Sequence, residues 1–163
     1  MTTRRMSLFA IPAVLFVSGA ARSYTKSGSG GLAYYPSETQ CFERIYGRVN
    51  AVQNPAIGCS GSKYWTIDVE TYAPGTKTFR VGGKTEFAVW TDPGTTTCAA
   101  IVLDATTGYQ VRWTAHQIIS SYGGWKTLGT LPVNTGENVQ FECFLSPVVY
   151  SDPSPGYVSN VEF

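Results

Sequence analysis

The stretch Cys98-Ala-Ala-Ile-Val-Leu-Asp104 decides the fold class, together with the turn Ala105-Thr-Thr-Gly108 and the run Tyr109-Gln-Val-Arg-Trp-Thr-Ala115 that follow it. The first run is apolar at every position between its ends, which is typical of a strand buried on both faces. The second run alternates, so we expect its apolar positions (Tyr109, Val111, Trp113 and Ala115) to face inward and its polar positions to face solvent. The two runs predict a β-hairpin in the middle of a core.

The same alternation recurs along the chain. In Lys63–Tyr72 the apolar series Trp65, Ile67 and Val69 is expected to face inward, and Asn138–Leu145 repeats the pattern with Phe141 and Cys143 among its inward residues. The 17 glycines and 9 prolines divide the chain into short segments. We therefore predict an all-β fold, an antiparallel β-sandwich of jelly-roll or Ig-like type with about eight to ten short strands.

Three glycine positions are interpreted as breaks in this pattern. Gly47 is expected to mark a bulge or kink in the run Cys41–Asn50, which forms either a strand pair or one bent strand. Gly82-Gly83 is expected to turn the chain into a new strand over Lys84–Thr91. In that strand Trp90 is out of phase with the core.

The chain divides into three parts. Residues 1–21 carry Arg4 and Arg5, the apolar run Leu8–Val17 and the small residues Ser18-Gly-Ala-Ala21, which is the pattern of a secretory signal peptide. The apolar run is too short to cross a bilayer, which needs about 20 residues. Residues 22–33 are rich in Gly and Ser, and we expect a flexible lead-in there. Residues 34–163 form one sandwich domain, with no membrane span in the mature chain.

Charge and cysteine content narrow the class of protein. Removal of Arg4 and Arg5 with the signal peptide would lower the formal net charge from +1 to −1, and no basic run remains, so a nucleic-acid partner is not expected. The oligomeric state is left open. Four cysteines in an exported chain indicate two disulfides outside the cytoplasm, in the extracellular space or the periplasm.

Four cysteines allow three pairings. We favour Cys41–Cys59, which closes a modest loop around a turn region, and Cys98–Cys143, whose two cysteines both lie in strand-like runs. A zinc site is disfavoured because zinc ligands usually come in close pairs, whereas consecutive cysteines here are separated by 18, 39 and 45 positions.

No catalytic constellation is singled out, so we predict no enzyme, no cofactor and no metal. His116 is the only histidine and has no nucleophile pattern around it. A glycosidase needs two carboxylates, but the acids at outward strand positions form no distinct pair: Asp68, Glu70, Glu86, Glu142 and Glu162. The aspartates Asp92, Asp104 and Asp152 lie in or beside turns, where turn chemistry explains them as well as calcium does.

Three aromatic residues are candidates for ligand binding. Trp90, Tyr122 and Trp125 lie at outward or loop positions, and the segment Tyr122-Gly-Gly-Trp125 places two of them on a glycine-rich loop. An aromatic face complements the apolar C–H face of a pyranose, so these rings could stack on sugars. Packing at the core edge is the alternative role for each of them.

The end of the chain resembles a known group of domains. Gly124-Trp-Lys-Thr-Leu-Gly-Thr-Leu131, Asn138–Phe144 and Gly156-Tyr-Val-Ser-Asn-Val-Glu-Phe163 resemble the tail of golvesin-like and related carbohydrate-binding-module β-sandwiches. The four-cysteine layout is similar to that of small secreted β-sandwich proteins of bacteria, a resemblance that implies no particular activity. Neither resemblance supplies a binding residue.

The resulting hypothesis is an exported, non-catalytic binding or surface module whose partner is a carbohydrate or another cell-envelope component. Two alternatives remain open. One is a structural or protein-interaction domain without a small-molecule ligand, and the other is a secreted hydrolase, which would need two carboxylates within about 5–10 Å in one cleft.

Overall fold

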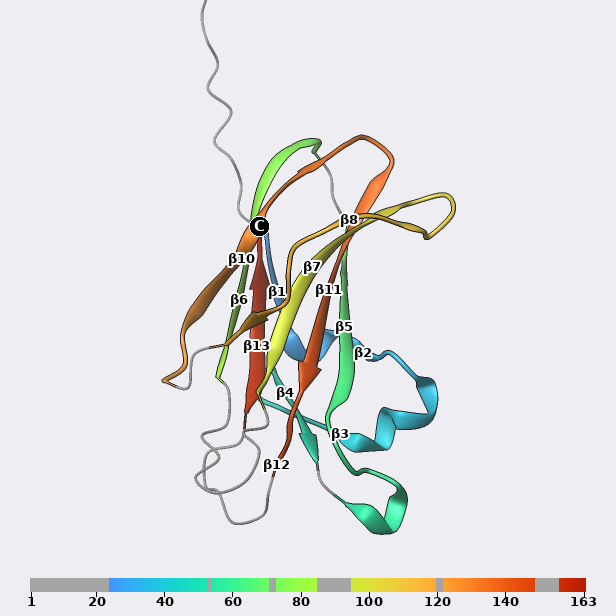
Figure 1. The fold of residues 1–163 in the computed structure, drawn as a ribbon, viewed down its shortest axis with the longest axis vertical. Helices are drawn as coiled ribbons and strands as arrows, with labels where there is room; N and C mark the ends of the chain where they lie inside the picture. Colours follow the sequence, from blue (N-terminus) through green and yellow to red (C-terminus); the bar gives the residue numbers. More distant parts are fainter. Residues whose placement is uncertain (1–23, 53, 71–72, 85–94, 120–121, 149–155) are drawn as a thin grey trace, which may run out of the picture.

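The computed structural model describes residues 24–52, 54–70, 73–84, 95–119, 122–148 and 156–163. Two β-sheets stand face to face along the long axis of the molecule (Figure 1). The strands in these ranges pair antiparallel, except for the parallel pair of β4 with β12. The prediction of an all-β antiparallel sandwich is confirmed.

Sheet A has the strand order β10-β6-β13-β4-β12, with β1 added beside β13 and β3 added beside β4. Its strands are β1 (Thr25–Ser27), β3 (Phe42–Ile45), β4 (Arg48–Val52), β6 (Gly75–Lys84), β10 (Trp125–Val133), β12 (Pro147–Val148) and β13 (Tyr157–Glu162).

Sheet B has the strand order β2-β5-β11-β7-β8, with β9 added beside β7. Its strands are β2 (Leu32–Ala33), β5 (Lys63–Val69), β7 (Thr97–Asp104), β8 (Gln110–Trp113), β9 (Gln117–Ile118) and β11 (Glu137–Leu145). Three short 3-10 helices complete the described part: η1 (Gly28–Gly30), η2 (Pro36–Cys41) and η3 (Pro55–Ile57). The last two lie beside the lower end of β5 in Figure 1.

The core lies between the two sheets and is built from the alternating apolar residues of the strands. Phe79 of sheet A packs edge-on against Phe141 of sheet B, with ring centroids 5.9 Å apart. The inward residues predicted for β5 and β11 are buried as expected: Trp65, Ile67, Val69, Val139, Phe141, Cys143 and Leu145. Alternation with one face in a core therefore fixed the orientation of these two strands.

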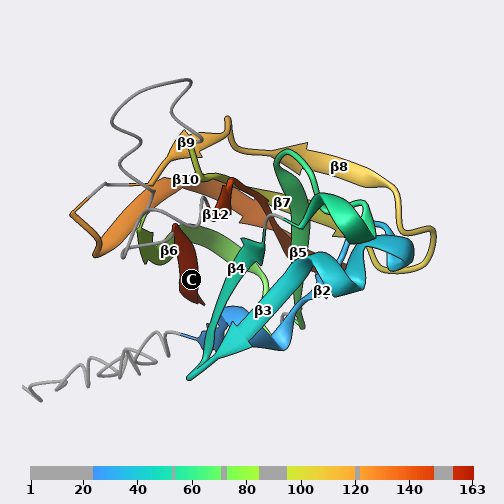
Figure 2. The same cartoon turned by 90° about the horizontal axis from the view of Figure 1, so that it is seen from below.

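The hairpin of β7 and β8 is present, but the facing predicted for its second arm is wrong. Val102 of the core opposes Arg112, and the register shifts by one residue next to this pair. Trp113 instead pairs with Ile101 on the outer face and is 61% exposed. β8 is the edge strand of sheet B and lies along the rim of the molecule (Figure 2). A bulge at an edge turns side chains to the other face, so periodicity alone does not set their direction.

The glycine-rich segment expected to be a flexible lead-in contributes elements to both sheets in its described part. Residues 25–33 form β1, η1 and β2. The indole Nε1 of Trp65 donates a hydrogen bond of 2.8 Å to the Gly28 carbonyl. A Cβ atom on Gly31 would lie only 2.2 Å from the Thr66 carbonyl oxygen. Glycine thus serves here to let two backbones approach closely. A flexible linker is also rich in glycine, so composition alone does not distinguish the two roles.

Gly82-Gly83 also has a packing role in place of the predicted turn. β6 continues through both residues to Lys84. A Cβ atom on Gly83 would lie 2.5 Å from the Tyr157 carbonyl oxygen of β13. Gly47 is neither a bulge nor a kink, because it forms the β3–β4 turn with Tyr46, both at positive φ (80° and 48°). Of the two readings given for this run, the strand pair is correct.

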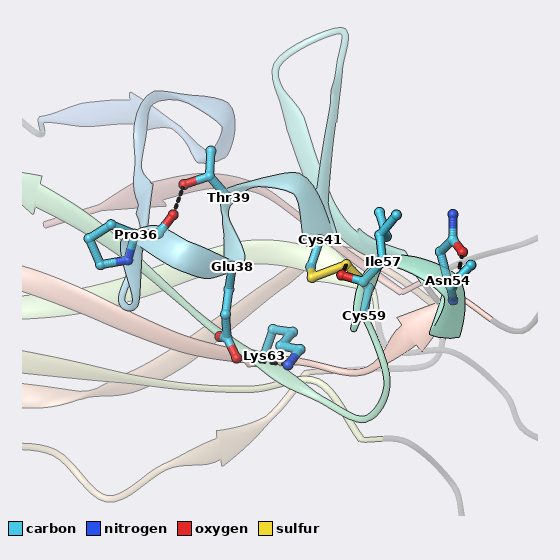
Figure 3. The surroundings of a disulfide bond; sticks show 9 residues. Pro36, Glu38, Thr39, Cys41, Asn54, Ile57, Cys59 and Lys63 are labelled. Carbon is cyan, nitrogen blue, oxygen red and sulfur yellow. Dashed lines mark hydrogen bonds and ion pairs between the residues drawn. A yellow bond between two sulfur atoms is a disulfide. The ribbon is translucent and has the colours of Figure 1, made fainter.

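Both predicted disulfides are present. Cys98 and Cys143 are direct partners on β7 and β11. Cys41 at the end of η2 is bonded to Cys59 in the connection between β4 and β5 (Figure 3). Disulfides of this kind are consistent with an extracellular or periplasmic location. In the described ranges we find no helix with the length and apolarity needed to cross a membrane. The predicted signal peptide, residues 1–21, lies outside the described residues.

Candidate ligand-binding face

A pocket of about 300 Å³ opens on the outer face of sheet A. It is lined by Ile45, Tyr46 and Arg48 at the β3–β4 turn, by Asn50 of β4 and by Tyr157 at the start of β13. The pocket thus joins one hairpin to a strand from the far end of the chain. We call these five residues the sheet A pocket.

The local sequence explains why these side chains point outward. Val49 and Ala51 are buried in the core, so the alternation of β4 turns their neighbours Arg48 and Asn50 to the outer face. The two-residue turn Tyr46-Gly47 has positive φ at both positions, the geometry of a tight hairpin. Tyr46 therefore projects almost completely into solvent beside the pocket.

The sheet A pocket combines an aromatic ring with a positive charge. The guanidinium carbon of Arg48 lies 4.4 Å from the centre of the Tyr157 ring, a cation–π contact. Asn50 Nδ2 donates to Glu43 Oε2 over 3.3 Å, so this neighbouring acid is engaged by an amide. Among the residues that the structure describes, Arg48 forms no ion pair. Its charge is therefore available to a ligand.

Of the three predicted binding residues, Trp125 lies on the same face as the pocket. Trp125 begins β10, pairs with Gly82 and is 43% exposed. The guanidinium carbon of Arg80 lies 5.3 Å from the centre of its ring. Tyr122 lies in the preceding turn and is 94% exposed. The third residue, Trp90, lies outside the described residues.

The turn that carries Tyr122 and Trp125 reaches the sheet A pocket through Tyr157. A Cβ atom built on Gly123 would lie 3.9 Å from the Tyr157 hydroxyl, and Gly83 N–H donates to the Gly124 carbonyl over 3.0 Å. The pocket residues themselves were missed in the sequence. Arg48 and Tyr157 are each adjacent to a buried valine of their strand. The alternation of the two strands therefore indicated that both side chains point outward.

The residues considered for catalysis do not gather in the pocket. His116 Nε2 lies 3.4 Å from Glu142 Oε1, next to sheet B. Asp68 accepts a hydrogen bond from Gln140, and Glu162 pairs with Arg80 at 3.6 Å. Among the described residues that line the pocket there is no carboxylate. Glu86 lies outside the described residues. Glu70 has an interaction partner, and its position does not single out a catalytic pair.

Asp104 has a structural role in the β7–β8 turn. Its Oδ1 accepts hydrogen bonds from Thr107 N, Thr107 Oγ1 and Thr106 N, at 2.8, 3.0 and 3.0 Å. These bonds, with that of the Thr107 backbone the strongest, hold the pKa of the Asp104 carboxyl below its ordinary value. The described ranges contain no group of three or more metal-ligating side chains. Asp92 and Asp152 fall outside them.

No protein-family model matches the chain, and no curated protein matches it in sequence. The GH26-CBM35 β-(1,4)-mannanase of Podospora anserina has a similar fold over 86% of this chain and 27% of its own, with 9% identity and a TM-score of 0.47. The isomalto-dextranase of Arthrobacter globiformis T6 is similar over 71% of this chain and 18% of its own, with 15% identity and a TM-score of 0.42. The chain thus spans less than a third of either enzyme, and likenesses this remote say nothing about function.

Proposed function

We propose that this protein is an exported, non-catalytic module that binds carbohydrate on the outer face of sheet A. The observation that carries the proposal is the sheet A pocket, in which Arg48 stacks on Tyr157 beside the turn of Tyr122 and Trp125. The glycan belongs to the cell envelope or to material outside the cell. Tyr122 and Trp125 extend the aromatic surface, and Trp90 stays a proposed contributor.

The chemistry of this face suits a sugar. A pyranose has apolar C–H faces and a rim of hydroxyl groups, so it needs an aromatic surface and hydrogen-bonding groups side by side. Tyr157 and Tyr46 supply rings, while the guanidinium of Arg48 carries five N–H donors. Because Arg48 forms no ion pair in the described structure, a glycan that carries carboxylate groups is favoured over a neutral one.

Binding to polysaccharides tests the proposal. Native affinity electrophoresis in gels that contain neutral or uronate-rich polysaccharides would measure retardation of the wild type, Tyr46→Ala, Arg48→Gln and Trp125→Ala. We expect retardation of the wild type and about fivefold or greater loss of affinity in the variants, the size of effect seen when an interface anchor is truncated. Tyr109→Ala is the matched control, because Tyr109 is also an exposed tyrosine near a hairpin turn, at the far end of β7.

Three outcomes would contradict the proposal. A wild type that no polysaccharide retards favours the structural or protein-interaction alternative. Equal losses in Tyr46→Ala and Tyr109→Ala would show that exposed tyrosines anywhere on the surface account for the binding. Release of reducing ends from a bound polysaccharide would instead support the hydrolase alternative.

A further inference from the structure

A second aromatic surface lies on the opposite side of the molecule, on the outer face of sheet B. Ring centroids of Tyr34 and Tyr35 are 4.9 Å apart, those of Tyr34 and Tyr64 are 6.1 Å apart, and those of Tyr64 and Phe144 are 4.8 Å apart. Three of these side chains are exposed, with Tyr34 at 52% and Tyr35 at 53%. We call the four residues the sheet B band.

The register of sheet B extends this band across the strands. Phe144 of β11 lies opposite Tyr64 of β5 and opposite Thr97 of β7, and Thr97 lies opposite the exposed Ile118 of β9. The aromatic rings span two spacings between adjacent strands, about 10 Å, and Thr97 and Ile118 extend the same face to four spacings, about 19 Å. An elongated surface of this length fits a chain-like ligand better than a single small molecule.

A row of hydrogen-bonding groups runs beside the band. Glu142 lies on the same face of β11 two residues before Phe144, with His116 at 3.4 Å from its carboxylate. Farther along, Gln140 Nε2 donates to Asp68 Oδ1 over 2.6 Å. Aromatic rings next to a carboxylate, an imidazole and an amide complement the C–H faces and the hydroxyl groups of a sugar chain. A surface that binds a protein would instead have an apolar centre with a polar rim on all sides. Here the hydrogen-bonding groups form a row beside the aromatic rings.

Covalent and ionic links hold the band in place before any ligand binds. Tyr34 N–H donates to the Tyr64 carbonyl over 3.0 Å, and η2 begins at Pro36, directly after the two tyrosines. Glu38 of η2 forms an ion pair of 2.7 Å with Lys63 of β5, and Cys41 at its end is bonded to Cys59 (Figure 3). A surface fixed in this way loses little conformational entropy on binding.

We propose that the sheet B band is a second carbohydrate site, specific for a neutral glycan chain, so that the protein holds two chains on opposite faces. The specificity follows from charge, because the carboxylates of Glu142 and Asp68 beside the band would repel an anionic glycan, and Lys63 is paired with Glu38. This inference rests on the proposed function of the sheet A pocket. It adds to that function the ability to bridge two glycans.

Two variants separate the band from the pocket. Tyr34→Ala with Tyr35→Ala removes two exposed rings of the band, and Arg48→Gln alters the pocket alone. Affinity electrophoresis on neutral and uronate-rich polysaccharides would measure each site. Turbidity of a soluble mixture of the two polysaccharides would measure bridging. Tyr109→Ala again is the control, and thermal melting checks that each variant is folded.

We expect the band variant to lose affinity for neutral polysaccharide by about tenfold, to keep its affinity for uronate-rich polysaccharide and to lose bridging. Wild-type binding that Tyr34→Ala with Tyr35→Ala leaves unchanged on every polysaccharide would overturn the second site and leave the proposed function standing. A wild type that binds no polysaccharide would overturn both. A wild-type dimer in size-exclusion chromatography that the band variant dissociates would show that a second copy of the chain occupies the band, which also overturns the inference.

Discussion

Both outer faces of the sandwich carry aromatic side chains, but the charged groups beside these rings differ between the two faces. On sheet A, Arg48 stacks on Tyr157 in a pocket and has no ion-pair partner among the described residues. On sheet B, the aromatic rings of the band lie in an open row, and the acids beside them are engaged by neighbours. The inward residues of both sheets form one shared core. A sandwich can therefore change the chemistry of one face without changing the other.

The two faces differ because different structural elements position their aromatic side chains. The pocket depends on the tight turn Tyr46-Gly47, which brings a hairpin beside the start of β13. The band depends on η2 and the Cys41–Cys59 disulfide, which hold Tyr34 and Tyr35 against β5. The pocket is thus set by a tight turn together with the pairing of β4 with β13, and the band by a crosslink over 18 positions.

Removal of the disulfides gives the largest expected effects. The entropy of the closed loops predicts a loss of about 4 kcal/mol for Cys98→Ala with Cys143→Ala and about 3 kcal/mol for Cys41→Ala with Cys59→Ala. The first pair joins β7 to β11 within the core, so its removal should destabilise the whole domain. The second pair should weaken binding at the band and spare the pocket. Urea denaturation and affinity electrophoresis measure the two effects. Equal binding losses on both faces in the second variant would contradict the distinction.

Gly31→Ala tests whether the glycine-rich segment is packed. A Cβ atom there would meet the Thr66 carbonyl oxygen at 2.2 Å, so we expect a loss of about 1–3 kcal/mol in the free energy of unfolding. Gly30→Ala is the matched control, since its Cβ would lie 3.5 Å from the end of the Lys26 side chain. That control should stay within about 0.5 kcal/mol of the wild type. Similar values for the two variants in urea denaturation would support a flexible lead-in after all.

The salt dependence of binding should differ between the faces. Binding that depends on the charge of Arg48 is screened by salt, so affinity for uronate-rich polysaccharide should fall several-fold between about 0.05 and 0.5 M NaCl. Affinity for neutral polysaccharide at the band should stay nearly constant over that range. Arg48→Gln should remove the salt dependence of binding to uronate-rich polysaccharide and leave binding to neutral polysaccharide unchanged. The same slope on both ligands would argue for a single site.

The smallest effect concerns Glu137, which lies at the start of β11 and pairs with Arg112 of β8. The Asn134 backbone N–H and, to a lesser extent, the Arg112 guanidinium lower the pKa of the Glu137 carboxyl from its ordinary value of 4.5. Its contribution, about 1 kcal/mol, is present above pH 4.5 and is lost as the pH falls through the lowered pKa.

Urea denaturation as a function of pH checks this prediction. Glu137→Gln should be less stable than the wild type at pH 7, and the two curves should converge in acid. Ligand binding on both faces should be unaffected. A difference that grows as the pH falls would contradict the assignment.

The sequence predicted the sandwich, both disulfides and the inward residues of β5 and β11, because alternation is reliable where one face is buried. It failed at β8, where an edge bulge reverses the direction of Trp113. It also failed where glycines pack backbones closely, as at Gly31 and Gly83, because composition does not separate packing from flexibility.

The candidate sites were harder to predict than the fold. The sequence indicates outward or loop positions for Tyr122 and Trp125, and in the structure both are exposed, Trp125 at the start of β10 and Tyr122 in the turn before it. Tyr157 and Arg48 meet only after distant strands pair, so no local pattern brings them together. For the sheet B band, the outward parity of Tyr64 and Phe144 was readable, but their contact with Tyr34 needs β2 in place.

Independence of the two faces is the decisive property, and a double-mutant cycle measures it. The cycle compares Arg48→Gln, Tyr34→Ala with Tyr35→Ala, and the combined variant, with calorimetric titration of uronate-rich and of neutral oligosaccharides. We expect each change to affect one ligand only, and the combined variant to show the sum of both losses within about 0.5 kcal/mol. If either change weakens both ligands, or if the combined loss equals that of one change alone, the protein has a single site and the two faces are not independent.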